Sequence, residues 1–219
     1  MQLSYYTVLL LSASILIPAI IGVIRLKEVG FKYRPFIYLI WVGAINEVVC
    51  TYCAYKFHNN IIPYVIYSLL ECFFLLWLFK RLNVFGKKHW VLYNLAIIFF
   101  CIWLFENFFS HRFGERFTYY FDIIYSFSVV LLSIHALNHV LATETEILKN
   151  PTFLICIGFI IFFSYEIIEI VFWMFGLANS AAFRKSVQTI LFLTNFLTNL
   201  IFGLAVLWMK KKQGFTRQF

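Results

Sequence analysis

Residues 152–176 read TFLICIGFIIFFSYEIIEIVFWMFG, and Glu166 and Glu169 are the only charged residues in this apolar run. An α-helix rises about 1.5 Å per residue, so about 20 apolar residues cross the hydrocarbon core of a bilayer. The run is long enough to predict a transmembrane helix. It also raises the question of function, because acidic residues inside such a stretch are rare and usually have a role.

Apolar runs of similar length recur along the chain, separated by short polar breaks. The predicted spans cover residues 4–24, 35–55, 61–80, 89–109, 118–142, 152–176 and 186–209. The composition agrees, since 63% of the residues are hydrophobic and 13% are charged, whereas a soluble domain is about half apolar and about a quarter charged. We therefore predict an all-α fold, a single polytopic membrane domain of seven transmembrane helices over residues 1–219. Pro18 lies inside the first span and predicts a kink there.

The distribution of basic residues predicts how the spans are oriented. Of the 18 Lys and Arg residues, 13 fall on one side of the predicted bundle. They are Arg25, Lys27, Lys32, Arg34, Lys80, Arg81, Lys87, Lys88, Lys149, Lys210, Lys211, Lys212 and Arg217. Cytoplasmic loops carry such an excess, so we expect the N-terminus outside, the C-terminus in the cytoplasm, and a multi-pass protein of the cytoplasmic (inner or plasma) membrane. Its expected partner is the lipid bilayer. The net charge of +8 could suggest a nucleic-acid partner, but the basic residues lie in short clusters between apolar runs, so we predict no nucleic-acid partner.

Two of the predicted spans begin with similar residues. The shared positions are Ser4, Tyr5, Tyr6, Ser12 and Ser14 in the first span and Thr118, Tyr119, Tyr120, Ser126 and Ser128 in the fifth. Both spans run in the same direction, so spans 1–3 and 5–7 would form parallel triplets joined by span 4. A 3+1+3 repeat of this type occurs in transporters. The likeness is confined to these few positions and indicates no membership of a family.

Six of the ten acidic residues lie within the predicted spans. Counted from the outer loops, most of them fall at a similar depth near the middle of the bilayer, where Asn side chains also occur. The predicted binding layer consists of Asn46, Glu47, Glu71, Glu166, Glu169, Asn195 and Asn199. Glu106 and Asp122 lie closer to the outer surface, where they would line an entrance.

No Lys or Arg lies in the interior of a predicted span to pair with these acids. An ionised carboxylate at the centre of a bilayer costs about 2.5–3.5 kcal/mol on insertion scales. The carboxyl groups must therefore be protonated, exposed to water in a cavity, or neutralised by a bound cation. A plainer interpretation stays open, in which buried acids and amides only hydrogen-bond helices to one another.

Metal ligands and catalytic motifs are weakly represented. His135 and His139 are four residues apart and form a weak candidate for a two-point metal contact, although interfacial histidines are the simpler interpretation. Cys50 and Cys53 form an equally weak pair, better explained as packing residues. Nucleotide-binding and hydrolase motifs are absent, the sequence identifies no cofactor, and an enzyme is not favoured.

Three functions fit these features. The first is a small membrane transporter or channel that holds a proton, a cation or a cationic solute at the carboxylate layer. The second is a seven-helix sensor or signalling partner that acts through another membrane or cytoplasmic protein, since the chain has no output domain of its own. The third is an intramembrane enzyme that modifies lipid, with carboxylates as acid and base or as metal ligands.

Overall fold

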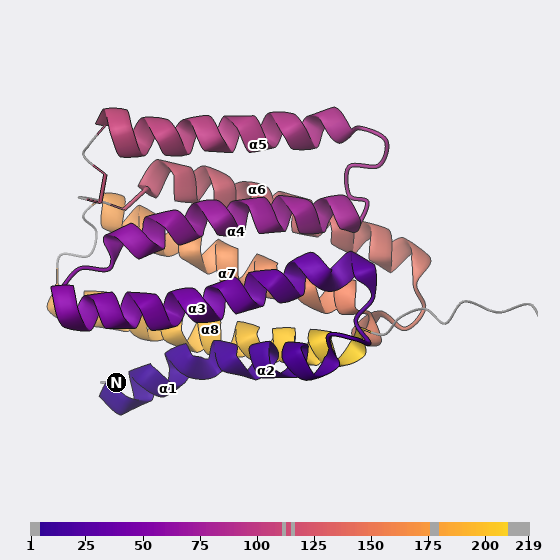
Figure 1. The fold of residues 1–219 in the computed structure, drawn as a ribbon, viewed down its shortest axis with the longest axis horizontal. Helices are drawn as coiled ribbons and strands as arrows, with labels where there is room; N and C mark the ends of the chain where they lie inside the picture. The colour runs from indigo at the N-terminus through magenta and orange to yellow at the C-terminus, as the bar shows by residue number, and fades with distance from the viewer. Residues whose placement is uncertain (1–4, 111–112, 115–116, 176–179, 210–219) are drawn as a thin grey trace, which may run out of the picture.

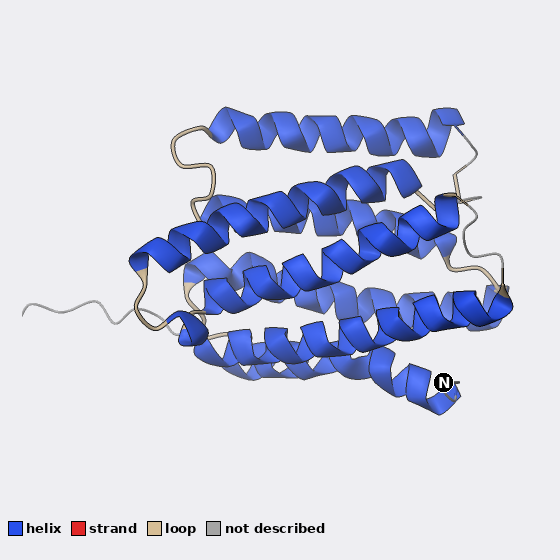
Figure 2. Ribbon diagram, turned by 180° about the vertical axis from the view of Figure 1, so that it is seen from behind, coloured by secondary structure: helices blue, strands red, loops and turns tan. Residues whose placement is uncertain are grey.

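A computed structural model of the chain describes residues 5–110, 113–114, 117–175 and 180–209, with the side chains of residues 5, 6, 8 and 9 left out. The described chain is all helical and has no strand (Figure 2). The long helices are α3 (Arg34–Phe57), α4 (Ile61–Arg81), α5 (His89–Leu104), α6 (Tyr119–Thr143), α7 (Pro151–Met174) and α8 (Ala181–Trp208). Shorter segments are α1 (Tyr5–Ser12), η1 (Ala13–Ile15), α2 (Leu16–Arg25), η2 (Phe31–Tyr33), η3 (Phe105–Ser110) and η4 (Ile147–Lys149).

The helices lie side by side in a bundle (Figure 1). Successive helices are neighbours: α3 packs on α4, α6 on α7 and α7 on α8, while α2 packs against both α8 and α3. Helix α5 lies at the edge of the bundle, against α4 and α6. Within the described residues, six helices are long and apolar enough to cross a membrane, and Leu10–Arg25 forms a shorter apolar helix. This arrangement is compatible with a multi-pass membrane protein.

The first helical segment is interrupted where the sequence predicts it. Pro18 has no N–H with which to bond the carbonyl of Ser14, and the backbone there tightens into the 3-10 turn η1 between α1 and α2. The turn therefore divides one continuous apolar segment into two short helices. The first predicted span, residues 4–24, corresponds to this divided segment.

The limits of the other helices lie within a few residues of the predicted spans, except at two places. Helix α5 ends at Leu104, where the π-helical segment η3 continues the predicted span to Ser110, and the other exception is the start of α8. That helix begins at Ala181 instead of residue 186, because the Ser180 side chain accepts a hydrogen bond from the Phe183 N–H at its first turn. Arg184 and Lys185 therefore lie on the exposed first turns of α8, not in the preceding loop. Several residues used above lie outside the described part of the chain: Ser4, Gly176, Lys210, Lys211, Lys212 and Arg217.

Aromatic rings fill the bundle near the end where α3 begins and α4 ends. Phe36 contacts Phe202 and Phe159 with ring centroids 5.0 Å and 5.9 Å apart, and Phe79 lies 6.3 Å from Phe159. Phe36 and Phe79 are fully buried. We call Phe36, Phe79, Phe159 and Phe202 the aromatic cluster. It joins α3, α4, α7 and α8 at one level of the bundle.

Gly158 on α7 lets the aromatic cluster close. A Cβ at this position would overlap the ring of Phe202, whereas a Cβ at Gly203 on α8 would make an ordinary contact of 3.5 Å with Ile17. We predict that Gly158→Ala lowers the free energy of unfolding by about 1–3 kcal/mol through overpacking, and that Gly203→Ala does not lower it. Unfolding in mixed detergent micelles measures both variants.

The double variant Gly158→Ala with Phe202→Leu tests whether the loss of stability comes from overlap between the alanine methyl group and the Phe202 ring. The smaller side chain makes room for the methyl group, so the alanine should cost less in this background than in the wild type. An equal cost in the two backgrounds would show that Phe202 does not limit the size of residue 158.

Candidate functional site

Three acidic residues from three helices approach one another inside the bundle. Glu71 comes from α4, Asp122 from α6 and Glu166 from α7. The Asp122 side chain is buried, and those of Glu71 and Glu166 are partly buried. Glu166 lies within electrostatic range of both other carboxyl groups, and Asp122 within range of Glu71. We call these three residues the acid cluster.

Each carboxyl group of the acid cluster accepts hydrogen bonds from hydroxyl groups. Tyr67 donates to Glu71 Oε1 at 2.9 Å, one turn before it on α4. Ser126 of α6 donates to Glu166 Oε2 at 2.9 Å and so ties α6 to α7. Asp122 Oδ2 accepts from Thr118 at 3.2 Å and, over a longer distance of 3.4 Å, from Tyr64 of α4.

The Tyr125 hydroxyl adds a buried polar group whose hydrogen bonding is incomplete. It is buried on α6 and makes no hydrogen bond of good geometry with any described residue. Its strongest electrostatic neighbour is the Glu71 carboxyl group, and Glu166 is also within range. A buried hydroxyl without a partner is costly, so a group that fills this gap would be stabilised.

Basic side chains do not neutralise the acid cluster. Among the described residues, the ion pairs join Arg25 to Glu28 and Lys149 to Glu146, and both lie outside the long helices. Ionised carboxylates in an apolar interior require a cation, water or a proton. The cluster thus provides acceptor oxygens and hydroxyl groups, and no cationic side chain of the described residues pairs with it.

Glu106 has a different and structural role. Its two carboxyl oxygens accept hydrogen bonds from the N–H groups of Tyr120 at 3.2 Å and Phe121 at 2.9 Å. The π-helical segment η3 at the end of α5 carries Glu106 to the N-terminus of α6, where unpaired N–H groups and the helix dipole favour a negative charge. Glu106 and Asp122 are both buried, at 3% exposure. Their assignment to an entrance stays a prediction.

The remaining residues of the predicted layer form separate contacts. Glu169, on the same helix as Glu166, accepts from Trp173 at 3.3 Å and lies at the edge of the acid cluster. Glu47 on α3 bonds the Ser12 hydroxyl at the end of α1, while its neighbour Asn46 accepts from Cys50 at 3.4 Å. These three residues are partly buried and do not join the acid cluster directly.

The two asparagines of α8 form a second polar contact, against the interrupted first helix. Asn199 is buried and donates to Ser14 at 2.8 Å and to Asn195 Oδ1 at 3.2 Å. The predicted single layer is therefore divided into an acid cluster on α4, α6 and α7 and an asparagine contact between α8 and η1. Which of these residues bind a ligand stays a prediction.

The candidate metal ligands are not gathered. His135 and His139 are exposed on α6, and within the described residues no group of three His, Cys, Asp or Glu side chains is close enough to hold a metal ion. That statement includes the acid cluster. The cluster therefore lacks the spacing of a metal site.

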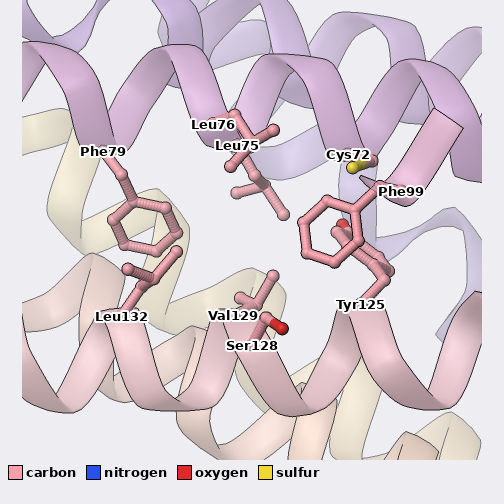
Figure 3. A pocket seen from close by; sticks show the side chains of 9 residues that line it. All are labelled: Cys72, Leu75, Leu76, Phe79, Phe99, Tyr125, Ser128, Val129 and Leu132. Atoms are coloured by element: carbon pink, nitrogen blue, oxygen red, sulfur yellow. The ribbon is translucent and has the colours of Figure 1, made fainter. Parts of the chain in front are cut away.

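An apolar crevice leads away from the acid cluster between α4, α5 and α6 (Figure 3). Its lining residues are Cys72, Leu75, Leu76, Phe79, Phe99, Tyr125, Ser128, Val129 and Leu132. It begins at Tyr125, ends at Phe79 of the aromatic cluster, and is too narrow for a water molecule. This crevice therefore does not provide a wet passage from the acid cluster toward Phe79.

Sequence reasoning missed the hydroxyl groups around the acids. Tyr67 and Thr118 each precede their acid by four residues, a spacing that places both side chains on one helix face. That spacing could have identified them from the sequence. Tyr64 and Tyr125 carried no comparable signal, because their contacts with acids depend on how α4 and α6 pack.

Comparisons of the chain with known protein families, with curated proteins and with solved structures find no match.

We predict that Glu106→Ala destabilises the protein, because the first turn of α6 loses the acceptor of two N–H groups. Loss of a helix cap costs about 1 kcal/mol, and burial of the freed groups adds to this value. Thermal unfolding in detergent measures the change, with Glu144→Ala as the control in an exposed loop. An unchanged unfolding midpoint for Glu106→Ala would contradict the capping role.

Proposed function

We propose that the chain is a small integral membrane transporter or channel that holds a proton or a small cation at Glu71, Asp122 and Glu166. The observation that carries the proposal is the meeting of three carboxyl groups from three helices inside an apolar bundle, with hydroxyl donors and no pairing Lys or Arg among the described residues. Acids placed in this way mark ion pathways and proton relays in membrane proteins.

The alternative of hydrogen-bonded helix contacts accounts for part of the site only. Single hydroxyl–carboxyl bonds join α6 to α7 and α4 to α6, as such contacts do in membrane bundles. Serine or asparagine would make the same bonds without placing three like-charged groups within range of one another. The accumulation of acids therefore favours a site for a positively charged ligand.

A vesicle assay tests the proposal. Purified protein in lipid vesicles should conduct protons, sodium or potassium down an imposed gradient faster than protein-free vesicles do. Glu166→Gln removes one ionisable group and keeps the acceptor for Ser126, so we predict a flux at least tenfold lower. Internal pH and cation indicators report the three ions separately.

Glu146→Gln is the matched control, because Glu146 is exposed and pairs with Lys149 in a loop. This variant should conduct as the wild type does. Vesicles with wild-type protein that conduct none of the three ions, or a Glu166→Gln variant with unchanged flux, would contradict the proposed function.

We further propose that the bundle crosses the cytoplasmic membrane seven times, with Tyr5–Arg25 as the first span, the N-terminus outside and the C-terminus inside. Within the described chain, basic residues concentrate at the end of the bundle where α2 ends, α3 begins and α4 ends. The order of packing is compatible with two parallel triplets, α2–α3–α4 and α6–α7–α8, joined by α5. This correspondence supports the proposed repeat.

Cysteine labelling tests the orientation. We predict that Asn59→Cys, between α3 and α4, reacts with a membrane-impermeant thiol reagent in intact cells. Asn83→Cys, just after α4, should react only after the membrane is permeabilised. The opposite pattern would show that the chain is inserted the other way round, and equal labelling of both sites in intact cells would reject a single span between them.

A further inference from the structure

Titratable groups and hydroxyls form a series that leads into the bundle from one end. Asp122 lies in the first turn of α6 and Tyr64 in the first turn of α4, beside Thr118. Tyr125 lies about one turn deeper on α6. Glu71 lies ten residues after the start of α4, or about 15 Å into the bundle at about 1.5 Å per residue. The series therefore runs from the end where α4 and α6 begin toward the middle of the helices.

Every element packed around the acid cluster contributes to this series. The groups that face the three acids are Tyr64 and Tyr67 of α4, Glu106 of η3, Thr118, Tyr125 and Ser126 of α6, and Glu169 of α7, with Glu47 of α3 beyond Tyr67. These groups are acids or hydroxyls, and the thiol of Cys72 on α4 is also within electrostatic range of Glu71 and Tyr125. Hydroxyl groups donate and accept at once, so they can pass a proton from one carboxyl group to another without themselves holding a charge.

The spacing of the acids distinguishes between possible ligands. The three carboxyl groups are within electrostatic range, yet within the described residues they are too far apart to share a metal ion. A proton needs a single oxygen at a time. The Tyr125 hydroxyl supplies the missing link, since it is buried, lies within reach of the Glu71 carboxyl group without a hydrogen bond of good geometry, and has Glu166 within electrostatic range.

The other end of the bundle is closed by apolar groups. Beyond Tyr125, the crevice is lined mainly by Leu, Val and Phe side chains and is too narrow for water. It ends at Phe79, whose ring packs on Phe159 in the aromatic cluster. Apolar constrictions of this kind exclude water and ions. The protonatable groups therefore communicate with one end of the bundle in this structure.

We propose that the ligand of the acid cluster is the proton, which enters where α4 and α6 begin, through Asp122 and Tyr64, and is held between Glu166 and Glu71 by way of the Tyr125 hydroxyl. In the transfer step, the carboxylic acid of Glu166 gives its proton to the Tyr125 oxygen while the Tyr125 O–H gives its own proton to the Glu71 carboxylate. The O–H bond of Glu166 breaks as a new O–H bond forms on Tyr125, and the original O–H bond of Tyr125 breaks as one forms on Glu71. Tyr125 is neutral before and after the step. The aromatic cluster is the barrier at the opposite end. This inference rests on the proposed function and narrows its ligand to one ion.

The variant Tyr125→Phe tests the relay because it removes one hydroxyl and keeps the ring. Among the described residues that hydroxyl makes no hydrogen bond of good geometry, so the variant should unfold at close to the wild-type temperature. In vesicles with a trapped pH indicator, and with potassium and valinomycin to set the voltage, its proton flux should be at least tenfold lower. Tyr93→Phe is the control, since it removes an exposed hydroxyl that contacts Lys80 on the outside of the bundle. Its proton flux should equal that of the wild type.

The outcomes separate this inference from the proposed function. Proton flux in Tyr125→Phe that equals the wild-type rate would overturn the relay. Sodium or potassium flux that Glu166→Gln abolishes, without any proton flux in the wild type, would overturn the inference and leave the proposed function standing. An absence of flux for all three ions would reject both.

Discussion

Three carboxyl groups without a pairing basic side chain constrain this structure more than any other feature. In a bilayer, a polar group that the protein does not satisfy internally is exposed to hydrocarbon at a cost of several kcal/mol. Glu71, Asp122 and Glu166 avoid that cost by lying between α4, α6 and α7, where tyrosine, serine and threonine hydroxyls donate to them. The packing of these three helices and the chemistry of the site are therefore linked. A rotation of any one helix would break hydrogen bonds and expose an acid to lipid.

The two ends of the bundle have different chemical character. Toward the start of α4 and α6 the interior holds acids and hydroxyls, and at the other end it holds edge-on phenylalanine rings. Glu106 stabilises the polar end by capping α6, which fixes the height of Asp122 one turn later. The Gly158 and Phe202 contact stabilises the apolar end, because the absence of a side chain on α7 lets the ring enter. The polar and the apolar groups of the interior are therefore separated along the length of the bundle.

The sequence was sufficient to predict the positions of the helices. Apolar runs located the long helices, and Pro18 located the 3-10 turn η1. The sequence also identified Glu71 and Glu166 as acids of similar depth. It could not determine helix rotation, so the predicted layer did not separate the acid cluster from Glu47 and Asn199, which contact the first helical segment, or from Asn195, which contacts Asn199. Tyr125 was missed for the same reason. The chain has 13 tyrosines, and the spacing of apolar residues along a helix does not show which tyrosine hydroxyl lies near an acid.

The direction in which the three acids point can be measured with spin labels in lipid vesicles, by comparing each acid position with the residue two places further along its helix. The pairs are Glu71 with Phe73, Asp122 with Ile124 and Glu166 with Ile168, and the apolar member of each pair is exposed on the surface of the bundle. Molecular oxygen concentrates in lipid, so its collision rate with the label reports exposure to acyl chains. Our account predicts a lower rate at the acid position in all three pairs. Equal or higher rates at the acid positions would mean that the carboxyl groups face lipid, and the central site would not exist.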